Sequence, residues 1–312
     1  SYATLSHCWG TVQPIRLLRS KVEQFKGGIN MSDLPRAFRE AVVAARNLGV
    51  LYIWIDSLCI MQDQDDPRDW NQEASLMHKV YSNAVCNTAA SDAADGSEGL
   101  FRTRDPRAQR SRASLWITGL DNEYDNTWIP VTVVHKALWE KNVTFSRLNR
   151  RGWVFQERIL SPRILHFGKA QVFWECRELE ATEFYPDEWP ITRELHEPDT
   201  LLKALDLQHY LAQLPPSMSM TLEDARAALY AGMVELYTTR TLTHPSDRLI
   251  AFSGIAQHLE AMFGDEFVAG LWRSQIAGDL RWSTVVDDDK PRHRPLRYRA
   301  PSWSWAAVDG PV

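Results

Sequence analysis

Hydrophobic positions along the first ninety residues follow two periods, one typical of strands and one typical of helices. Short apolar runs, which favour buried parallel strands, are separated by segments with apolar side chains at helical spacing. The predicted strands cover residues 2–9, 51–56 and 84–89, and the predicted helices cover residues 34–48 and 70–82. We expect Ser32 and Asp33 to cap the first helix and Gly49 to end it. This alternation predicts an α/β sheet with right-handed crossovers.

The pattern is less regular after residue 90. Residues 91–126 are rich in Gly, Asp, Arg and Ser, which predicts that this segment contains a long loop, and the acidic, proline-bearing residues 178–219 predict a linker or an irregular excursion. Further predicted helices cover residues 153–160, 222–239 and 246–263, and further strands cover residues 164–176, around Gly168, and 300–306. We therefore expect an α/β domain at residues 1–177 and a mixed, mainly helical extension at residues 178–312 that packs on it.

The composition is that of a globular protein and excludes several classes of function. The 312 residues carry a net charge of -5, which gives no basic surface for nucleic acid. No apolar run is long enough to span a bilayer. Three of the four cysteines lie in apolar runs, and none belongs to a CxxC pair or a zinc motif. We expect reduced, buried thiols in a cytoplasmic protein that binds no metal and no cofactor.

One octet concentrates chemical groups that a binding site needs. Residues 151–158 (RGWVFQER) hold two arginines, an indole, an amide and a carboxylate. In a helix, Trp153 and Glu157 are four positions apart and lie on the same face, where they suit a ring or a cationic heterocycle. The structural alternative places Trp153 in the core and pairs Glu157 with an arginine.

Polar side chains also stand where two predicted strands end. Ser6, His7 and Trp9 end the first strand, and Asp56 ends the second. Ligands of open α/β sheets bind at the carboxyl ends of strands, so neighbouring strands would bring these groups to one edge. In the alternative, Asp56 caps a turn and His7 is a core histidine. His7 and Cys8 point to opposite faces of a strand, so we expect no thiol–imidazole pair between them.

The order of the motifs adds a resemblance to a known family. The motifs are YATLSHCWG (2–10), LYIWIDSLCIMQ (51–62), WNQEASLM (70–77), VYSNA (80–84), GLF (99–101) and RGWVFQERILSPR (151–163). In this order they resemble the fungal heterokaryon incompatibility (HET) domain over about residues 1–176. Later segments resemble the extension that follows this domain in filamentous fungi: SDRLIAFSGI (246–255), AGLW (269–272) and RAPSWSW (299–305).

The resemblance implies a role in self/non-self recognition, in which incompatible fusion triggers cell death. The HET domain has been likened to the TIR fold, a flavodoxin-like, mostly parallel sheet flanked by helices. Some TIR domains cleave NAD at the nicotinamide bond with one glutamate that follows a tryptophan by four positions. Trp153 and Glu157 match that spacing, so the resemblance implies Glu157 as the catalytic residue.

The remaining candidate residues would bind the substrate under this interpretation. Asp56 would bind ribose, and Trp9 or Trp153 would stack on a ring. Arg151 and Arg158 would bind the pyrophosphate of NAD or neutralise the charge of Glu157. Ser6 and His7, at the end of the first strand, complete the candidate substrate-binding set.

Two functions of other classes stay open. A tryptophan-lined, apolar pocket would suit a secondary-metabolite enzyme that catalyses a cyclisation, such as a Diels–Alder reaction, on an apolar metabolite. Alternatively, the chain is a non-enzymatic signalling module that self-associates. The position of Glu157 discriminates between these functions. NAD cleavage requires Glu157 to face an open cleft shared with Trp9 and Asp56.

Overall fold

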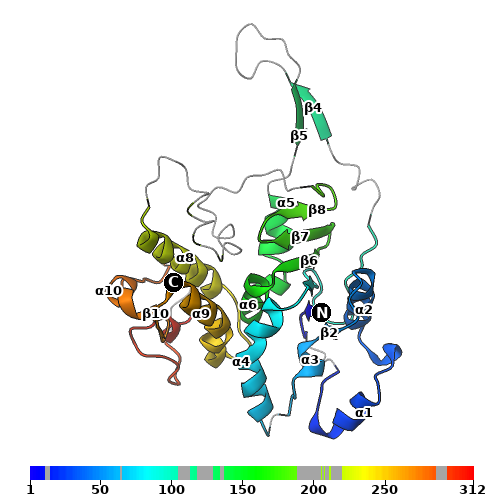
Figure 1. Ribbon diagram of the computed structural model, residues 1–312, viewed down its shortest axis with the longest axis horizontal. Helices are drawn as coiled ribbons and strands as arrows, with labels where there is room; N and C mark the ends of the chain where they lie inside the picture. Colours follow the sequence, from blue (N-terminus) through cyan, green and yellow to red (C-terminus); the bar gives the residue numbers. More distant parts are fainter. Residues whose placement is uncertain are drawn as a thin grey trace.

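A six-stranded sheet forms the centre of the computed structural model (Figure 1). The structure describes residues 1–10, 15–63, 65–104, 113–117, 129–133, 137–187, 205, 207, 211, 220–285 and 294–312. The strand order is β2-β1-β3-β6-β7-β8. The strands are β1 (Ala3–Ser6), β2 (Ile53–Trp54), β3 (Cys86–Ala89), β6 (Arg163–Phe167), β7 (Val172–Cys176) and β8 (Glu180–Thr182).

The first four strands of this sheet are parallel, and the last two pairs are antiparallel. Counted along the chain, the parallel strands have the order 2-1-3-4, which is how a flavodoxin-like sheet begins. The predicted α/β fold and the strand pair around Gly168 are thus confirmed. The prediction that residues 51–56 are buried is wrong, because β2 is a short edge strand. Leu51 and Tyr52 before it are 85% and 71% exposed.

Helices cover both faces of the sheet (Figure 1). Helix α2 packs on one face, where Phe38 and Ala41 meet Leu5 and Ile55. Helices α4 and α6 lie on the other face, beside each other. The helices of this half are α1 (Val22–Lys26), α2 (Arg36–Asn47), α3 (Asp56–Cys59), α4 (Arg68–Ser82), α5 (Ala137–Trp139) and α6 (Gly152–Leu160).

Several local predictions are wrong for identifiable reasons. Ser32 and Asp33 do not cap α2; they form a separate 3₁₀ turn, and the N-cap position is Pro35. The segment 91–126, expected to contain a long loop, also holds strand β4 (Ala113–Ile117), which pairs with β5 (Ile129–Val133), and the segment 178–219, expected to be a linker or irregular, also holds β8. Most other residues of these two segments lie outside the described part of the chain. Cys59 is exposed, because it ends the short helix α3 at the sheet edge.

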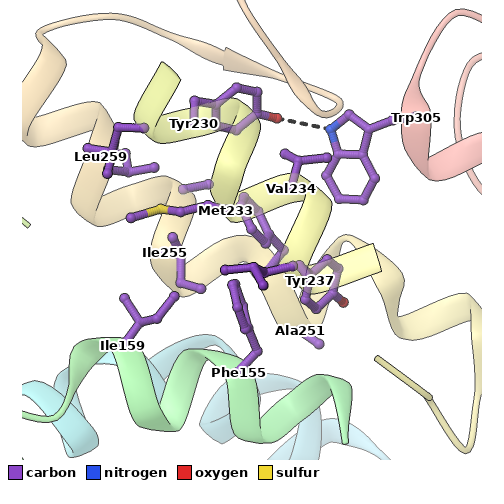
Figure 2. Close-up of a cluster of buried hydrophobic side chains, with 14 of the residues drawn as sticks. Phe155, Ile159, Tyr230, Met233, Val234, Tyr237, Ala251, Ile255, Leu259 and Trp305 are labelled. Atoms are coloured by element: carbon purple, nitrogen blue, oxygen red, sulfur yellow. Dashed lines mark hydrogen bonds between the residues drawn. The ribbon is translucent and has the colours of Figure 1, made fainter. Parts of the chain in front are cut away.

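The C-terminal half is mainly helical and packs on α4 and α6. Its elements are α8 (Leu222–Thr238), α9 (Ile250–Phe263), β9 (Phe267–Val268), β10 (Leu271–Trp272) and α10 (Ile276–Asp279). Figure 2 shows Phe155 and Ile159 of α6 pointing into a cluster of buried side chains from α8 and α9. Among the described residues, no helix combines the length and the apolar composition that crossing a bilayer requires.

The predicted strand at 300–306 is instead a tight turn that buries an indole. The Ser304 hydroxyl accepts a hydrogen bond from the backbone N–H of Ala306 and starts a 3₁₀ turn (Trp305–Ala307). The Trp305 indole N–H then donates to the Tyr230 hydroxyl at 2.9 Å (Figure 2). The tryptophan alternation therefore reflects burial in the helical cluster and not a sheet.

Two glycines let the C-terminal half approach α6 closely. The Gly152 N–H donates to the carbonyl of Thr241 at 2.8 Å, and a Cβ at position 152 would lie 2.5 Å from the Leu242 side chain. A Cβ at Gly254 would lie 2.5 Å from Oε1 of Gln156. Glycine suits both positions, because a Cβ there would collide with these side chains and force them to move. The close approach brings residues 243–247 to the start of α6.

Candidate active site

A cavity of about 280 Å³ opens where β1 and β2 end, at the carboxyl edge of the parallel strands. This is the edge at which ligands of open α/β sheets bind. Five parts of the chain line it: the end of β1, the residues that follow β2, helix α4, helix α6 with the residue before it, and the segment before α9. The lining residues are Leu5, His7, Trp9, Asp56, Ile60, Gln62, Trp70, Met77, Arg151, Trp153, Glu157, Thr243, His244 and Asp247.

Glu157 presents a carboxyl group to this cavity from the buried side of α6. The residue is 6% exposed, and its Oε2 accepts a hydrogen bond from the Ser6 hydroxyl. Burial raises the pKa of the carboxyl to about 7, and the charge of Asp56 also raises it. Hydrogen bonds from Ser6 and Tyr81 and the charge of Arg151 lower the pKa but only partly offset burial. Glu157 is therefore poised between its acid and its carboxylate near neutral pH.

A buried amide fixes the direction of the Ser6 hydroxyl. The Asn87 amide N–H donates to the Ser6 oxygen at 2.9 Å, and the Thr4 hydroxyl donates to the Asn87 amide oxygen at 3.0 Å. A hydroxyl has one proton, and the Ser6 proton goes to Glu157, because that contact is shorter than the 3.3 Å between the Ser6 oxygen and the Asn87 amide oxygen. Asn87 and Tyr81 were not among the predicted site residues, although a polar Asn inside the strand-like run 84–89 is a usable signal.

Replacing Ser6 by Ala is expected to raise the pKa of Glu157 further above about 7, because the carboxylate loses a hydrogen bond that lowers this pKa. A pH titration of the carboxyl stretch by difference infrared spectroscopy measures it. Ser161→Ala is the matched control, because the Ser161 hydroxyl donates to the backbone carbonyl of Glu157 at 2.6 Å and not to its carboxyl group. An unchanged or lower pKa in Ser6→Ala would contradict this description of the site.

Asp56 is held in position by an indole and a backbone N–H. The Trp9 indole N–H donates to its Oδ2 at 3.0 Å, and the Ser57 N–H donates to its Oδ1 at 2.6 Å. Asp56 is also the first residue of the short helix α3, whose N-cap position is Ile55 and which has no side-chain cap, so the alternative in which Asp56 caps a turn is wrong. Nδ1 of His7 lies 3.8 Å from Oδ1 of Asp56, and burial lowers the pKa of His7, which favours a neutral imidazole near pH 7.

The two arginines of the octet have different environments. Arg151 lines the cavity and donates to the backbone carbonyl of His7, and it forms no ion pair with a carboxylate of the described residues. Its positive charge is available to an anionic ligand. Arg158 lies two helical turns further along α6 and does not line the cavity. Its guanidinium forms a buried, two-pronged pair with Glu175, with nitrogen–oxygen distances of 2.7 and 3.0 Å.

Aromatic side chains form the other walls of the cavity. The Trp70 and Trp153 rings meet edge to face with their centroids 5.9 Å apart, and the Trp153 indole N–H donates to Asp247 at 3.3 Å. The structure thus brings Trp9, Asp56, Trp153, Arg151, His7 and Glu157 to one cavity, with Ser6 directly behind Glu157. Thr243, His244 and Asp247 reach the cavity only through the docking of the C-terminal half, so the sequence did not place them at the site.

Within the described residues, no group of three or more His, Cys, Asp or Glu side chains is arranged to hold a metal ion. Among the described residues, the polar and aromatic groups that line the cavity are three carboxyl groups, one guanidinium, three indoles, two imidazoles, one amide and one hydroxyl. These groups suit a ligand with a flat or cationic ring, hydroxyl groups and an anionic portion.

Comparison with known proteins gives one match. The model of the family described as heterokaryon incompatibility protein (HET) matches residues 2–157. The comparisons with curated proteins and with solved structures found no match. The matched residues run from β1 into α6 and end at Glu157, so they include every part of the cavity except the segment 243–247.

Proposed function

The chain belongs to the heterokaryon incompatibility (HET) family, and we propose that it cleaves NAD between nicotinamide and ribose in incompatibility signalling. Glu157 is the catalytic residue in this proposal. One observation carries it: a buried carboxyl group with a pKa near 7 faces a cavity that it shares with Trp9, Asp56 and Trp153.

The lining of the cavity suits the nicotinamide half of NAD. The nicotinamide ring is a cationic pyridinium, and an indole face attracts such a ring through the cation–π interaction. Trp9, Trp70 and Trp153 provide indoles. Asp56, oriented by Trp9, accepts hydrogen bonds from ribose hydroxyls, and Arg151 meets the adjacent phosphate.

In the proposed reaction the bond between ribose C1′ and nicotinamide N1 breaks, and its electron pair stays on N1. Nicotinamide leaves as a neutral molecule, and the ribose becomes an oxocarbenium-like cation. The Glu157 carboxylate stabilises that cation in a water-poor site, where the interaction is stronger than in bulk water. Water then attacks C1′, Glu157 accepts its proton and releases it to solvent, and ADP-ribose forms.

The charged lining favours NAD cleavage over a cyclisation of an apolar metabolite. A cyclase pocket of the expected kind would be apolar throughout, whereas Asp56, Glu157, Asp247 and Arg151 all line this cavity. A scaffold role for Glu157 would pair it with an arginine. The buried arginine pair of α6 is instead formed by Arg158 and Glu175.

We also propose residues 177/178 as the boundary between the HET domain and its extension. Thr243, His244 and Asp247 come from the extension and line the cavity. The extension would therefore complete the site that the HET domain begins.

The pH dependence of NAD cleavage tests the proposal. We expect kcat/KM to rise about tenfold per pH unit below about pH 7 and to level off above it, because the carboxylate of Glu157 is the active form. Nicotinamide release measured between about pH 5 and pH 9 gives the profile. A profile that falls as pH rises through 7 would show that the protonated acid is needed and would exclude this mechanism.

A further inference from the structure

A second hollow of about 460 Å³ adjoins the candidate active site. It is lined by Trp70, Asn71, Ala74 and Ser75 of α4, and by Leu249, Ile250, Ser253, Phe267 and Ala269 of the C-terminal half. The two hollows share one lining residue and are both lined by the segment that precedes α9. Trp70 lines both, and the segment that lines the first at Thr243, His244 and Asp247 continues into the second at Leu249 and Ile250.

The second hollow combines apolar walls with a few neutral hydrogen-bonding groups. Leu249 and Phe267 supply apolar surface, and Trp70 supplies an indole. The Ser75 and Ser253 hydroxyls donate to helix carbonyls at 2.6 and 2.7 Å and keep oxygen lone pairs that can accept. The exposed Asn71 amide forms no hydrogen bond with the described part of the chain. In contrast to the first cavity, this one is lined by no charged side chain of the described residues.

The two hollows together fit a ligand with two unlike halves. The first cavity, at about 280 Å³, is at the small end of ligand pockets, which hold roughly 300–1,000 Å³. It has room for a nicotinamide nucleoside but not for a whole dinucleotide. The second hollow has the features of an adenine site: flat apolar walls, and an amide that pairs with the amino group and N7 of adenine.

We propose that the second hollow binds the adenosine half of NAD while the nicotinamide half lies against Glu157. This inference rests on the proposed NAD cleavage and deepens it, since it assigns the rest of the substrate. Trp70 stands between the two subsites, and Ser253 and Asn71 face only the second. The chain would therefore select a dinucleotide over a mononucleotide through residues outside the catalytic cavity.

Filling the second hollow tests the assignment. Ser253→Phe places a ring in it, and Gln257→Phe places the same ring on an exposed position of the same helix as a control. Binding of AMP, nicotinamide mononucleotide and NAD is measured by calorimetry. We expect Ser253→Phe to weaken AMP and NAD binding at least about tenfold, the order that base–aromatic stacking contributes, and to leave nicotinamide mononucleotide binding unchanged. Gln257→Phe is expected to change none of the three.

The outcomes separate this inference from the proposed function. Loss of AMP binding in Ser253→Phe supports the adenosine subsite even if wild-type protein cleaves no NAD, in which case only the proposed reaction fails. AMP that binds both proteins equally, that fails to bind wild type, or that competes with nicotinamide mononucleotide overturns the subsite. NAD cleavage with an unchanged KM in Ser253→Phe overturns it too, while leaving the proposed reaction intact.

Discussion

Glu157→Gln is expected to lower the rate of nicotinamide release from NAD at least about 100-fold, the range in which a positioned acid–base group contributes to catalysis. The amide keeps the size of the side chain but has no negative charge to stabilise the oxocarbenium-like ribose. It also accepts no proton from the attacking water. Chromatographic measurement of nicotinamide at saturating NAD and about pH 8 checks the expectation. Wild-type turnover in the variant would remove Glu157 from the mechanism.

The stability of the same variant shows whether its fold is intact. Burial raises the pKa of Glu157 from 4.5 to about 7. This shift corresponds to about 3 kcal/mol of folding stability, which wild type loses when the carboxyl ionises. Below about pH 4.5 the carboxyl is protonated in the folded and in the unfolded chain. As pH rises from there to about 7, the unfolded chain releases this proton before the folded chain does, and wild type loses stability. The Glu157→Gln variant does not lose this stability, because glutamine has no proton to release in this pH range.

Denaturant unfolding at about pH 4 and pH 8 measures this linkage. The stability of Glu157→Gln relative to wild type is expected to become more favourable by about 3 kcal/mol between the two pH values. A relative stability that does not change with pH would mean that the carboxyl is not buried as described. An inactive variant that shows the expected change has lost its chemistry and not its fold.

Arg158→Met is expected to lower the free energy of unfolding by about 3–5 kcal/mol, the usual cost of breaking a buried ion pair by removing one partner. Arg158 and Glu175 are 3% and 0% exposed as side chains, and Nε2 of His166 lies 3.0 Å from the same Glu175 carboxylate. His166 in turn contacts the Ser91 hydroxyl at 3.2 Å. Without the guanidinium, the Glu175 carboxylate stays buried in the sheet with too little compensation for its lost hydration.

An exposed pair of the same kind provides the control. Arg273 lies 2.6 Å from Glu266, and the two side chains are 74% and 59% exposed. Arg273→Met is expected to change the stability little, because water screens and solvates both charges. If both variants lost the same free energy of unfolding, burial would not be the reason that the pair of Arg158 and Glu175 stabilises the fold. Since Arg158 does not line the cavity, the wild-type KM for NAD should persist in any folded fraction of Arg158→Met.

The sequence predicted the elements whose periodicity is strong and local. Strands β1, β3, β6 and β7 and helices α2, α4, α6, α8 and α9 all lie where hydrophobic spacing indicated them. The errors arise where tertiary contacts override local preference. Trp303 and Trp305 alternate as in a strand, but Trp305 is buried in the helical cluster, where its indole N–H donates to the Tyr230 hydroxyl. Leu51 and Tyr52 resemble a buried strand, yet they precede a strand at the sheet edge.

The residues of the candidate site also fall into those that the sequence could predict and those that it could not. Residues at strand ends and on one helix face were accessible to sequence reasoning, because parallel strands bring their carboxyl ends together. His7, Trp9 and Asp56 meet Glu157 at this edge. The two arginines of the octet could not be told apart, since spacing does not reveal that Arg158 has a buried partner 17 residues away.

The residues that the sequence analysis missed depend on the packing of distant segments. Asp247 reaches Trp153 only because α9 and the segment before it dock on α6, where Gly152 and Gly254 leave room. Nothing within a short window around Asp247 indicates this contact. Asn87 is different, because it lies in a strand next to β1, and a polar side chain there signals a buried hydrogen-bonding role.

Product analysis of NAD incubated with the wild-type chain tests the central claim most directly. We expect nicotinamide and ADP-ribose to appear in equal amounts, at a rate that rises with pH up to about 7. Chromatography with mass spectrometry identifies both products. The result that would contradict the account is intact NAD after prolonged incubation at about pH 8, including at protein concentrations high enough to promote self-association.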